Sequence, residues 1–340
     1  MPTQRKPTPR KAAYKASDVP SSRVETDRRI PLIILAVIAA LMALVLIFTQ
    51  CTKPASDDNM PAPGEPAVQS SASSSSSAAS SELQAPTNPS AKATFSEYTW
   101  GELKEISEKI AKAKSDSDAI AIATQYNLVN ADGKLDPSAT KSVALNDGST
   151  TEVRIIGFNH DTVSNGNGKA GITFMFTEGI GTAAMNDDGT SVGGWNNSYG
   201  TYFVGIELWS LIPDELASNI VEVSKSSNDG AEGSVSESGD VFWLPSYAEL
   251  FGSSGTEFAG ASATLGMEGS QYQLFADAGV SASSGNSALV VRMNDQATSW
   301  WLRSADPAHE NAWFYVDASG RPADQGAPEQ AYALVPGFCF

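Results

Sequence analysis

Two residue types that can do acid–base or metal chemistry stand side by side at His160 and Asp161. An imidazole titrates near neutral pH, and a neighbouring carboxylate can orient it. The whole chain has only two histidines, which argues against a site built on several imidazoles. We therefore expect His160 to be a structural residue, and we predict no metal ion and no other cofactor.

Two glycine-rich segments match short functional motifs. Residues 166–171 read GNGKAG, the pattern of a dinucleotide-binding loop, and residues 189–193 read GTSVG, the pattern around a nucleophilic serine. Both motifs need a strand before them and a helix after them. Here the first leads from a polar loop into the apolar run ITFMF, and the second lies inside the loop NDDGTSVGGWNN. Neither segment predicts nucleotide binding or hydrolysis.

Capping patterns mark the helices that have to position any functional side chain. The segment Thr99–Glu102 is a capping box before apolar residues at helical spacing, and it predicts a helix at about 99–114. Residues 115–118 read SDSD and predict a second helix at about 118–126. Similar signals predict further helices that begin at Ser198, Pro213 and Ser246.

Elsewhere the apolar period is two, which indicates strands. The turn Asn-Asp-Gly at 146–148 lies between alternating apolar residues and predicts a β-hairpin. Helices and strands are mixed without a regular strand–helix–strand rhythm, which favours an α+β fold with a mainly antiparallel sheet. Further strands are predicted over 172–176, 242–244, 300–303, 312–316 and 331–338.

Charge is distributed unevenly along the chain of 340 residues, whose formal net charge is −17. Residues 1–29 hold eight Lys and Arg against three acidic residues, whereas residues 94–340 hold 12 Lys and Arg against 32 Asp and Glu. A part with a net charge of −20 repels phosphate, so we predict no nucleic-acid partner for it.

Residues 30–48 form an uncharged apolar run that follows Arg28 and Arg29. As a helix, 19 residues extend about 28 Å, close to the thickness of a bilayer's hydrocarbon core. The basic side stays in the cytoplasm. We predict a single-pass protein of the cell membrane that contacts the lipid bilayer through 30–48, with a cytoplasmic N-terminus and an extracytoplasmic C-terminal domain. A cleaved signal peptide and a lipoprotein modified at Cys51 are the alternatives.

The segment after the apolar run is rich in Ser, Pro and Ala, and between positions 70 and 81 nine of twelve residues are serine. Such a composition cannot bury enough apolar surface to offset chain entropy, so it predicts a disordered linker. The predicted organisation is a basic tail 1–29, a transmembrane helix 30–48, a linker 49–93, a helical lead-in 94–130 and a folded domain 131–340.

Several later segments resemble a known family. They read FWLPSYAEL (242–250), WWLRSA (300–305), AWFYVDASG (312–320) and ALVPGFCF (333–340). They are similar to the bacterial domain of unknown function numbered 6273, found in surface and secreted proteins, over about 150–340. The sequence resembles more weakly the C-type-lectin-like group around formylglycine-generating enzymes. The resemblance implies a C-type-lectin-like, mainly antiparallel sheet with flanking helices.

Glu249, Trp300 and Arg303 form the structural signature within these segments. Side chains alternate along a strand, so Trp301 and Arg303 share one face. A buried Arg needs an acidic partner, and Glu249 is the first candidate. The alternative is that the face with Trp301 and Arg303 contacts a ligand.

Two segments rich in Gly, Asn, Asp and Ser, at 187–199 and 224–240, are predicted as irregular loops that could carry a binding site. A Trp in a polar loop stacks well on sugars and protein anchors, so Trp195 is the predicted anchor. Its expected hydrogen-bonding neighbours are Asn196, Asn197 and Tyr199. The alternative is that Trp195 covers the core.

These observations favour a membrane-anchored surface protein whose domain binds an extracellular glycan or protein and is not an enzyme. Resemblance to formylglycine-generating enzymes would imply paired reactive cysteines, but the domain has only Cys339. With Cys51 at the membrane, no internal disulfide is expected. The alternatives are an envelope enzyme of that type, a hydrolase, or a structural or envelope-sensing protein.

Overall fold

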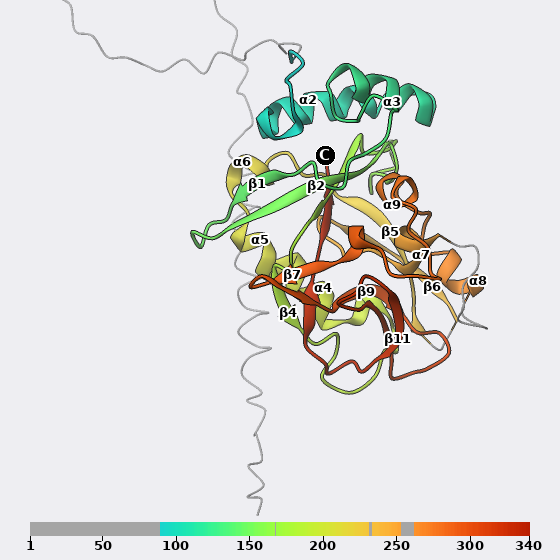
Figure 1. Ribbon diagram of the computed structural model, residues 1–340. Helices are drawn as coiled ribbons and strands as arrows, with labels where there is room; N and C mark the ends of the chain where they lie inside the picture. Colours follow the sequence, from blue (N-terminus) through green and yellow to red (C-terminus); the bar gives the residue numbers. More distant parts are fainter. Residues whose placement is uncertain (1–88, 167, 231–232, 253–261) are drawn as a thin grey trace, which may run out of the picture. The chain divides into compact units, whose positions relative to one another are not determined.

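A computed structural model describes residues 89–166, 168–230, 233–252 and 262–340 (Figure 1). All of them belong to one compact unit that extends from Ser81 to Phe340. The predicted tail, the predicted transmembrane helix and nearly all of the predicted linker lie outside the described residues. No helix in the described part of the chain is both long enough and apolar enough to cross a membrane.

The described unit is a mixed α+β domain with short helices and mostly antiparallel sheets, as the sequence predicts. Its α-helices are α2 (Trp100–Ile110), α3 (Asp116–Gln125), α4 (Tyr199–Tyr202), α5 (Leu208–Leu211), α6 (Asp214–Ala217), α7 (Tyr247–Phe251), α8 (Ser262–Gly266) and α9 (Gln273–Asp277). The remaining helical turns are η1 (Phe95–Glu97), η2 (Trp195–Asn197), η3 (Phe203–Glu207) and η5 (Ser287–Leu289).

The strands form two larger sheets and two hairpins. One sheet has the order β1 (Lys141–Ala144), β2 (Thr150–Phe158), β3 (Ile172–Phe176) and β13 (Gly337–Cys339). The other has the order β11 (Pro322–Gly326), β10 (Trp313–Val316), β9 (Trp300–Ala305), β12 (Tyr332–Leu334) and β4 (Gly181–Ala183). The hairpins are β5 (Val223–Asn228) with β6 (Val235–Asp240), and β7 (Val291–Met293) with β8 (Gln296–Thr298).

The capping signals place the first two helices correctly. At the start of α2, Thr99 accepts a hydrogen bond from the Glu102 amide, and the Glu102 carboxylate accepts one from the Thr99 amide. Ser115 is the N-cap of α3. On the buried side of α2, Ser107 donates to the Phe340 carbonyl oxygen (2.6 Å). The predicted lead-in therefore packs directly on the sheet that contains β13 (Figure 1).

The folded unit starts earlier than the predicted linker boundary at residue 93. The Lys92 amide donates to the Tyr98 hydroxyl (2.8 Å), and the Lys92 ammonium lies 3.0 Å from a Glu102 carboxylate oxygen. Pro89 is buried. Residues 89–93 thus belong to the domain, because their contacts with the first helices offset their chain entropy.

The last strand of the chain completes the first sheet. The predicted hairpin is confirmed as β1 and β2, and β3 follows in antiparallel register. On the other side of β3, β13 places Phe338 opposite Phe174, with ring centroids 5.0 Å apart. Phe340 and Trp100 add edge contacts to this aromatic cluster. The core therefore joins the lead-in, the middle and the end of the chain.

The predicted strand at 242–244 is wrong. Trp243 forms only an isolated bridge, in which its amide and carbonyl pair with Gly337 in the first sheet. Pro245 follows directly and lacks an amide hydrogen, so the pairing cannot extend. The predicted strand at 331–338 is also divided, because Pro336 separates β12 in the second sheet from β13 in the first.

The predicted loop at 224–240 is instead the hairpin of β5 and β6. Its strands lack the alternation of apolar residues that marks a half-buried strand. In β5 the inward positions include Lys225 and Ser227, which are fully buried polar residues. Polar contacts therefore replace apolar packing on this face.

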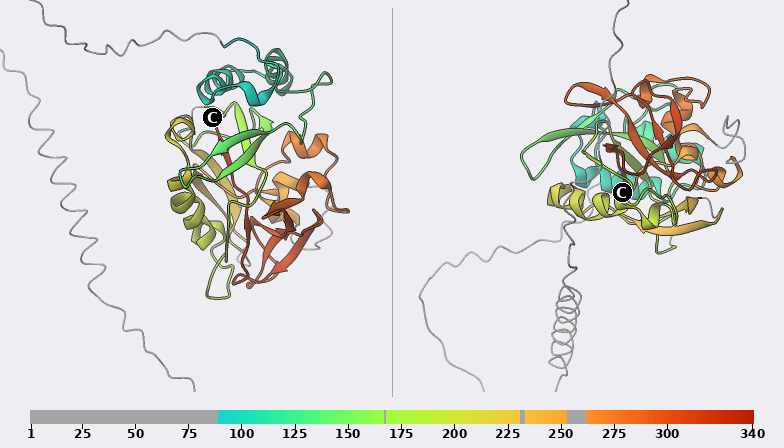
Figure 2. Two further views of the ribbon diagram at one scale, coloured as in Figure 1. Left: turned by 60° about the vertical axis from the view of Figure 1, so that its left-hand side comes forward. Right: turned by 90° about the horizontal axis from the view of Figure 1, so that it is seen from below.

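The predicted helix from Ser198 to Trp209 is confirmed as the continuous run of α4, η3 and α5. Ser198 caps it by accepting a hydrogen bond from the Thr201 amide. Its middle turn, η3, is a π-helix, a feature common at functional sites. In both views of Figure 2 this segment runs along the edge of the described unit.

Candidate functional site

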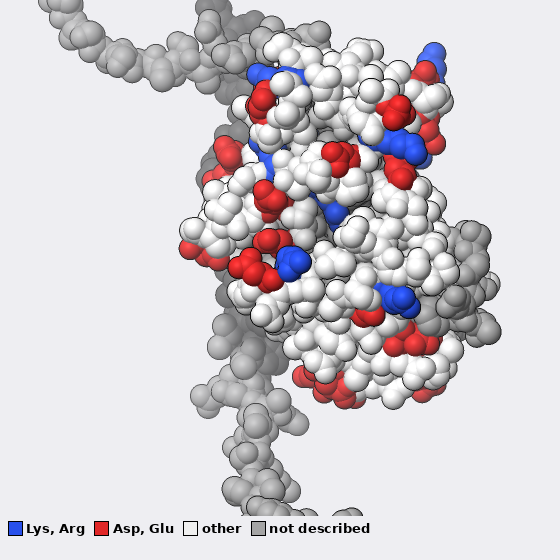
Figure 3. Space-filling model, in the orientation of Figure 1, with Lys and Arg blue, Asp and Glu red and all other residues white. Residues whose placement is uncertain are grey.

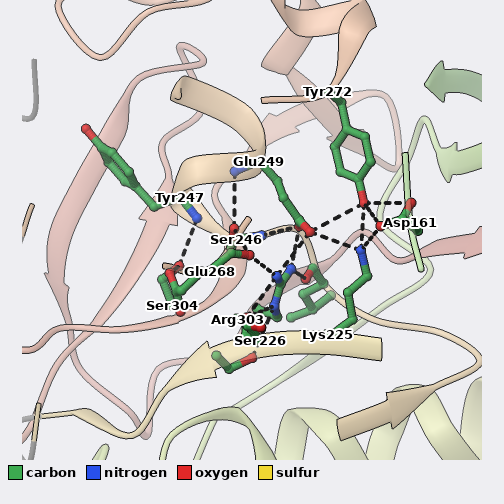
Figure 4. Close-up of polar contacts among 12 residues, drawn as sticks. Asp161, Lys225, Ser226, Ser246, Tyr247, Glu249, Glu268, Tyr272, Arg303 and Ser304 are labelled. Carbon is green, nitrogen blue, oxygen red and sulfur yellow. Dashed lines mark hydrogen bonds and ion pairs between the residues drawn. The ribbon is translucent and has the colours of Figure 1, made fainter. Parts of the chain in front are cut away.

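Arg303 and Glu249 form the predicted ion pair, and both side chains are buried (Figure 4). Arg303 lies in β9 and is fully buried, and Glu249 is the third residue of α7. Arg303 Nη1 donates to Glu249 Oε2, and Nη2 donates to Oε1 (3.1 Å). Glu249 Oε2 also accepts from the Ser246 amide (2.9 Å), which closes the capping box of α7. The pair therefore joins the start of α7 to β9.

The remaining donors of Arg303 meet carbonyl and hydroxyl oxygens. They contact the carbonyl oxygens of Leu244 (3.1 Å), Ser226 (3.1 Å) and Glu268 (2.7 Å), and the Ser227 hydroxyl (3.1 Å). A guanidinium has five N–H donors in a rigid fork, and here that fork joins four separate segments. The role of Arg303 is to hold β5, α7 and β9 together.

Lys225 extends the pair into a network. Its ammonium donates to Asp161, to Glu249 Oε1 (3.0 Å) and to the Tyr272 hydroxyl (2.8 Å), and it lies 4.0 Å from the centre of the Trp243 ring. Burial alone raises the pKa of Asp161, but the Lys225 ammonium and His160 hold that pKa well below its usual range. The network is thus ionised and fully enclosed.

Glu268 is a third buried carboxyl group beside these two cations. It accepts from the amide (3.0 Å) and the side chain (2.8 Å) of Asn228, and from the Ser304 hydroxyl. Burial raises the pKa of Glu268 to about 7, although Arg303 acts in the opposite direction. Lys225 and Arg303 already balance Asp161 and Glu249, so Glu268 has no cation of its own.

Sequence reasoning found Glu249 and Arg303, and it considered Asp161 only as a neighbour of His160. It missed Lys225 and Tyr272. Lys225 lies in the run VSKSSN, which carries no signal of burial. All residues of β9 are buried, Trp300 and Arg303 among them. Burial is what a structural role for these two residues requires. No route from solvent to the network is needed for that role.

Two of the predicted ligand-binding residues, Trp195 and Trp301, are fully buried. The prediction that Trp195 is an exposed anchor is therefore wrong. Trp195 begins η2 and packs against Gly200, so the alternative of a core-covering Trp describes its position. Trp301 donates from Nε1 to the Ala183 carbonyl oxygen (2.9 Å) and packs on Tyr332 with ring centroids 4.6 Å apart. Neither indole can stack on a ligand from these positions.

The other predicted ligand-binding residues, Asn196, Asn197 and Tyr199, are exposed. Tyr199 stacks on Tyr202 with ring centroids 5.6 Å apart, and about half of each side chain is exposed (51% and 48%). These rings lie at one wall of a surface hollow, which we call the tyrosine hollow. It is lined by Asn186, Asp187, Asp188, Asn197, Ser198, Tyr199 and Tyr202.

His160 has a structural environment. Its Nε2 lies 3.1 Å from both the carbonyl and the hydroxyl oxygen of Ser270, and its ring centre lies 4.2 Å from that of Tyr272. In the described ranges, no group of three or more His, Cys, Asp or Glu side chains is arranged to hold a metal ion.

The protein is thus a mixed α+β domain in which buried ion pairs join short helices to strands. Residues 170–340, half of the chain, match the family described as Domain of unknown function (DUF6273), and the chain belongs to this family. The family resemblance carried by 242–250 and 300–305 is therefore confirmed. No curated protein and no solved structure matches the chain.

Proposed function

We propose that this protein is a membrane-anchored surface protein whose domain binds a glycan in the tyrosine hollow. The single observation that carries the proposal is the exposed, stacked pair Tyr199 and Tyr202 beside two exposed carboxylates, Asp187 and Asp188. A protein ligand is the alternative occupant of the same hollow.

The tyrosine pair supplies the apolar part of such a site. Exposed side chains of this size cost solvation free energy, and neighbouring exposed Ile206 and Trp209 enlarge the apolar surface on the same helical run. Tyrosine combines a flat ring with a hydroxyl group, and this suits a partner that is apolar on its C–H face and polar at its edge. A sugar ring has both properties.

The polar part of the hollow suits hydroxyl groups. Asp187 and Asp188 are exposed carboxylates that accept hydrogen bonds, and Asn197 offers both a donor and an acceptor. On the face drawn in Figure 3, basic side chains are scattered singly among acidic ones. An acidic domain favours a neutral glycan over a phosphate-rich polymer.

A C-type-lectin-like relationship and the membrane anchor belong to the same proposal. The mostly antiparallel sheets with short flanking helices support the first, and the uncharged run at 30–48 supports the second. The domain acts as a binding module in this proposal and not as an enzyme. Burial raises the pKa of the Cys339 thiol well above its usual value, which makes it a poor nucleophile.

A glycan array probed with the full chain tests the binding function. Tyr199→Ala and Tyr202→Ala should each weaken binding to the selected glycan by about tenfold, because each removes a stacking ring. Tyr199→Phe is the matched control, since it keeps the ring and should bind nearly normally. Binding that is unchanged in both alanine variants would refute the site, and binding to host or envelope proteins alone would favour the protein ligand.

Topology is tested separately with protease added to intact cells. We expect release of a fragment that contains the described domain and protection of residues 1–29, because the basic flank stays in the cytoplasm. Secretion of a chain cleaved after the apolar run would instead show a signal peptide.

A further inference from the structure

Arg154 is a second buried arginine, and its surroundings differ from those of Arg303. It lies in β2 with 6% of its surface exposed. Its Nη2 donates to the Ala288 carbonyl oxygen (2.7 Å), and its guanidinium lies 5.7 Å from the centre of the Phe275 ring. Its buried Nε has no hydrogen-bond partner in the described part of the chain.

No carboxylate in the described ranges forms an ion pair with Arg154. Burial lowers the pKa of Arg154 to about 10, and no neighbouring charge counters that shift. With a pKa of about 10 the guanidinium of Arg154 remains protonated at neutral pH. Arg154 is therefore a buried cation without an anionic partner among the described residues. A buried charge without a counter-charge is costly, and ionisable groups with strongly perturbed pKa values cluster at functional sites.

Arg154 lines a surface hollow that could admit that counter-charge. The hollow has a volume of about 490 Å³, and no acidic side chain lines it. Its other polar groups come from Ser138, Asn286 and Ser287. Asn286 is held in place, because its side chain donates to the Ala278 carbonyl oxygen (3.1 Å) and accepts from the Ala288 amide (2.9 Å). The part of the wall that contains Asn286 and Ala288 is therefore held in place.

We propose that this hollow binds the carboxylate group of a small ligand, with Arg154 as its counter-charge. One guanidinium neutralises one negative charge, which matches a carboxylate better than a dianion in a domain with a large negative charge. The site is built from β2, η5 and the loop residues that flank them at 137–138, 278 and 285–286, and it shares no residue with the tyrosine hollow. It stands independently of the proposed glycan function.

Titration of the full chain with sodium acetate, against sodium chloride at equal ionic strength, tests the proposal. Acetate should raise the unfolding temperature of the wild type in a saturable manner, because it binds the folded state. Arg154→Met should weaken the apparent affinity at least about tenfold. Arg292→Met is the matched control, since Arg292 is exposed, and it should leave the affinity unchanged.

Three outcomes overturn the proposal. They are no saturable effect of acetate, an equal effect in Arg154→Met, and an Arg154-dependent effect of sulfate that acetate does not share, which would indicate a dianion site. A second measurement needs no variant: acetate should slow modification of Arg154 by phenylglyoxal, read by mass spectrometry of the wild-type chain. Equal modification with and without acetate would contradict carboxylate binding.

Discussion

Arg303 and Arg154 are both buried in strands, yet their surroundings are opposite. Arg303 is paired with Glu249 and satisfied by carbonyl oxygens on several segments, whereas Arg154 donates one hydrogen bond and meets no carboxylate among the described residues. The same residue type at a similar depth therefore serves two purposes. A satisfied guanidinium holds elements together, and an unsatisfied one marks a place for an external anion.

The largest expected effect is the loss of the satisfied arginine. Arg303→Met leaves the Glu249 carboxylate with Lys225 as its one cation, and it removes the donor from three carbonyl oxygens, two of them buried. It should therefore lower the free energy of unfolding by about 3–5 kcal/mol. Urea denaturation of the full chain measures this change. The exposed control Arg292→Met should change it by less than about 0.5 kcal/mol. A loss below about 1 kcal/mol for Arg303→Met would show that the network does not hold the fold.

Glu268 offers a further test of the network around Arg303. It is the third buried carboxyl group of a network that has two cations. Burial raises its pKa from 4.5 to about 7 in the folded state. The folded state therefore binds this proton more tightly, and stability should fall as the pH rises from about 4.5 to about 7. Glu268→Gln keeps an acceptor for Asn228 and removes the charge. It should raise the free energy of unfolding at pH 8 by up to roughly 3 kcal/mol.

The pH dependence of urea denaturation for the wild type and Glu268→Gln measures this effect. The exposed Glu237→Gln serves as the control and should keep the wild-type slope. An identical slope in Glu268→Gln and the wild type would contradict the assignment of the titration to Glu268.

The smallest effect is expected for the unsatisfied arginine. Arg154→Met removes an unpaired buried charge but also one hydrogen bond to Ala288, so the free energy of unfolding without ligand should change by at most about 1 kcal/mol. Thermal unfolding in chloride buffer measures it. A loss as large as that of Arg303→Met would erase the difference between the two sites and make Arg154 a structural residue.

The Arg303–Glu249 pair could be predicted because two local signals met. Alternation along 300–305 put Arg303 on a defined face, and the capping box at Ser246 fixed where Glu249 lies on its helix. A buried arginine needs an acidic partner, and Glu249 was the candidate that these two signals indicated. Most helix starts were predictable for the same reason, since capping depends on only four consecutive residues.

What could not be predicted depends on contacts between distant segments. Lys225 lies in a serine-rich run that looks exposed, and only the approach of Asp161 and Tyr272 makes its burial possible. Trp195 lies in a polar loop, yet the folding of that loop onto the sheets buries it completely. The unpaired state of Arg154 is a property of all its neighbours together, so no local pattern reveals it.

The pairing of β13 with β3 has a consequence for biosynthesis. Thr173 and Cys339, whose side chains lie 3.3 Å apart in this pairing, are 166 positions apart in the sequence. The sheet therefore cannot close before β13 has been synthesised, and until then β13 cannot cover the aromatic cluster around Phe174. Such a high contact order predicts slow folding and a demand for chaperones that shield the nascent chain.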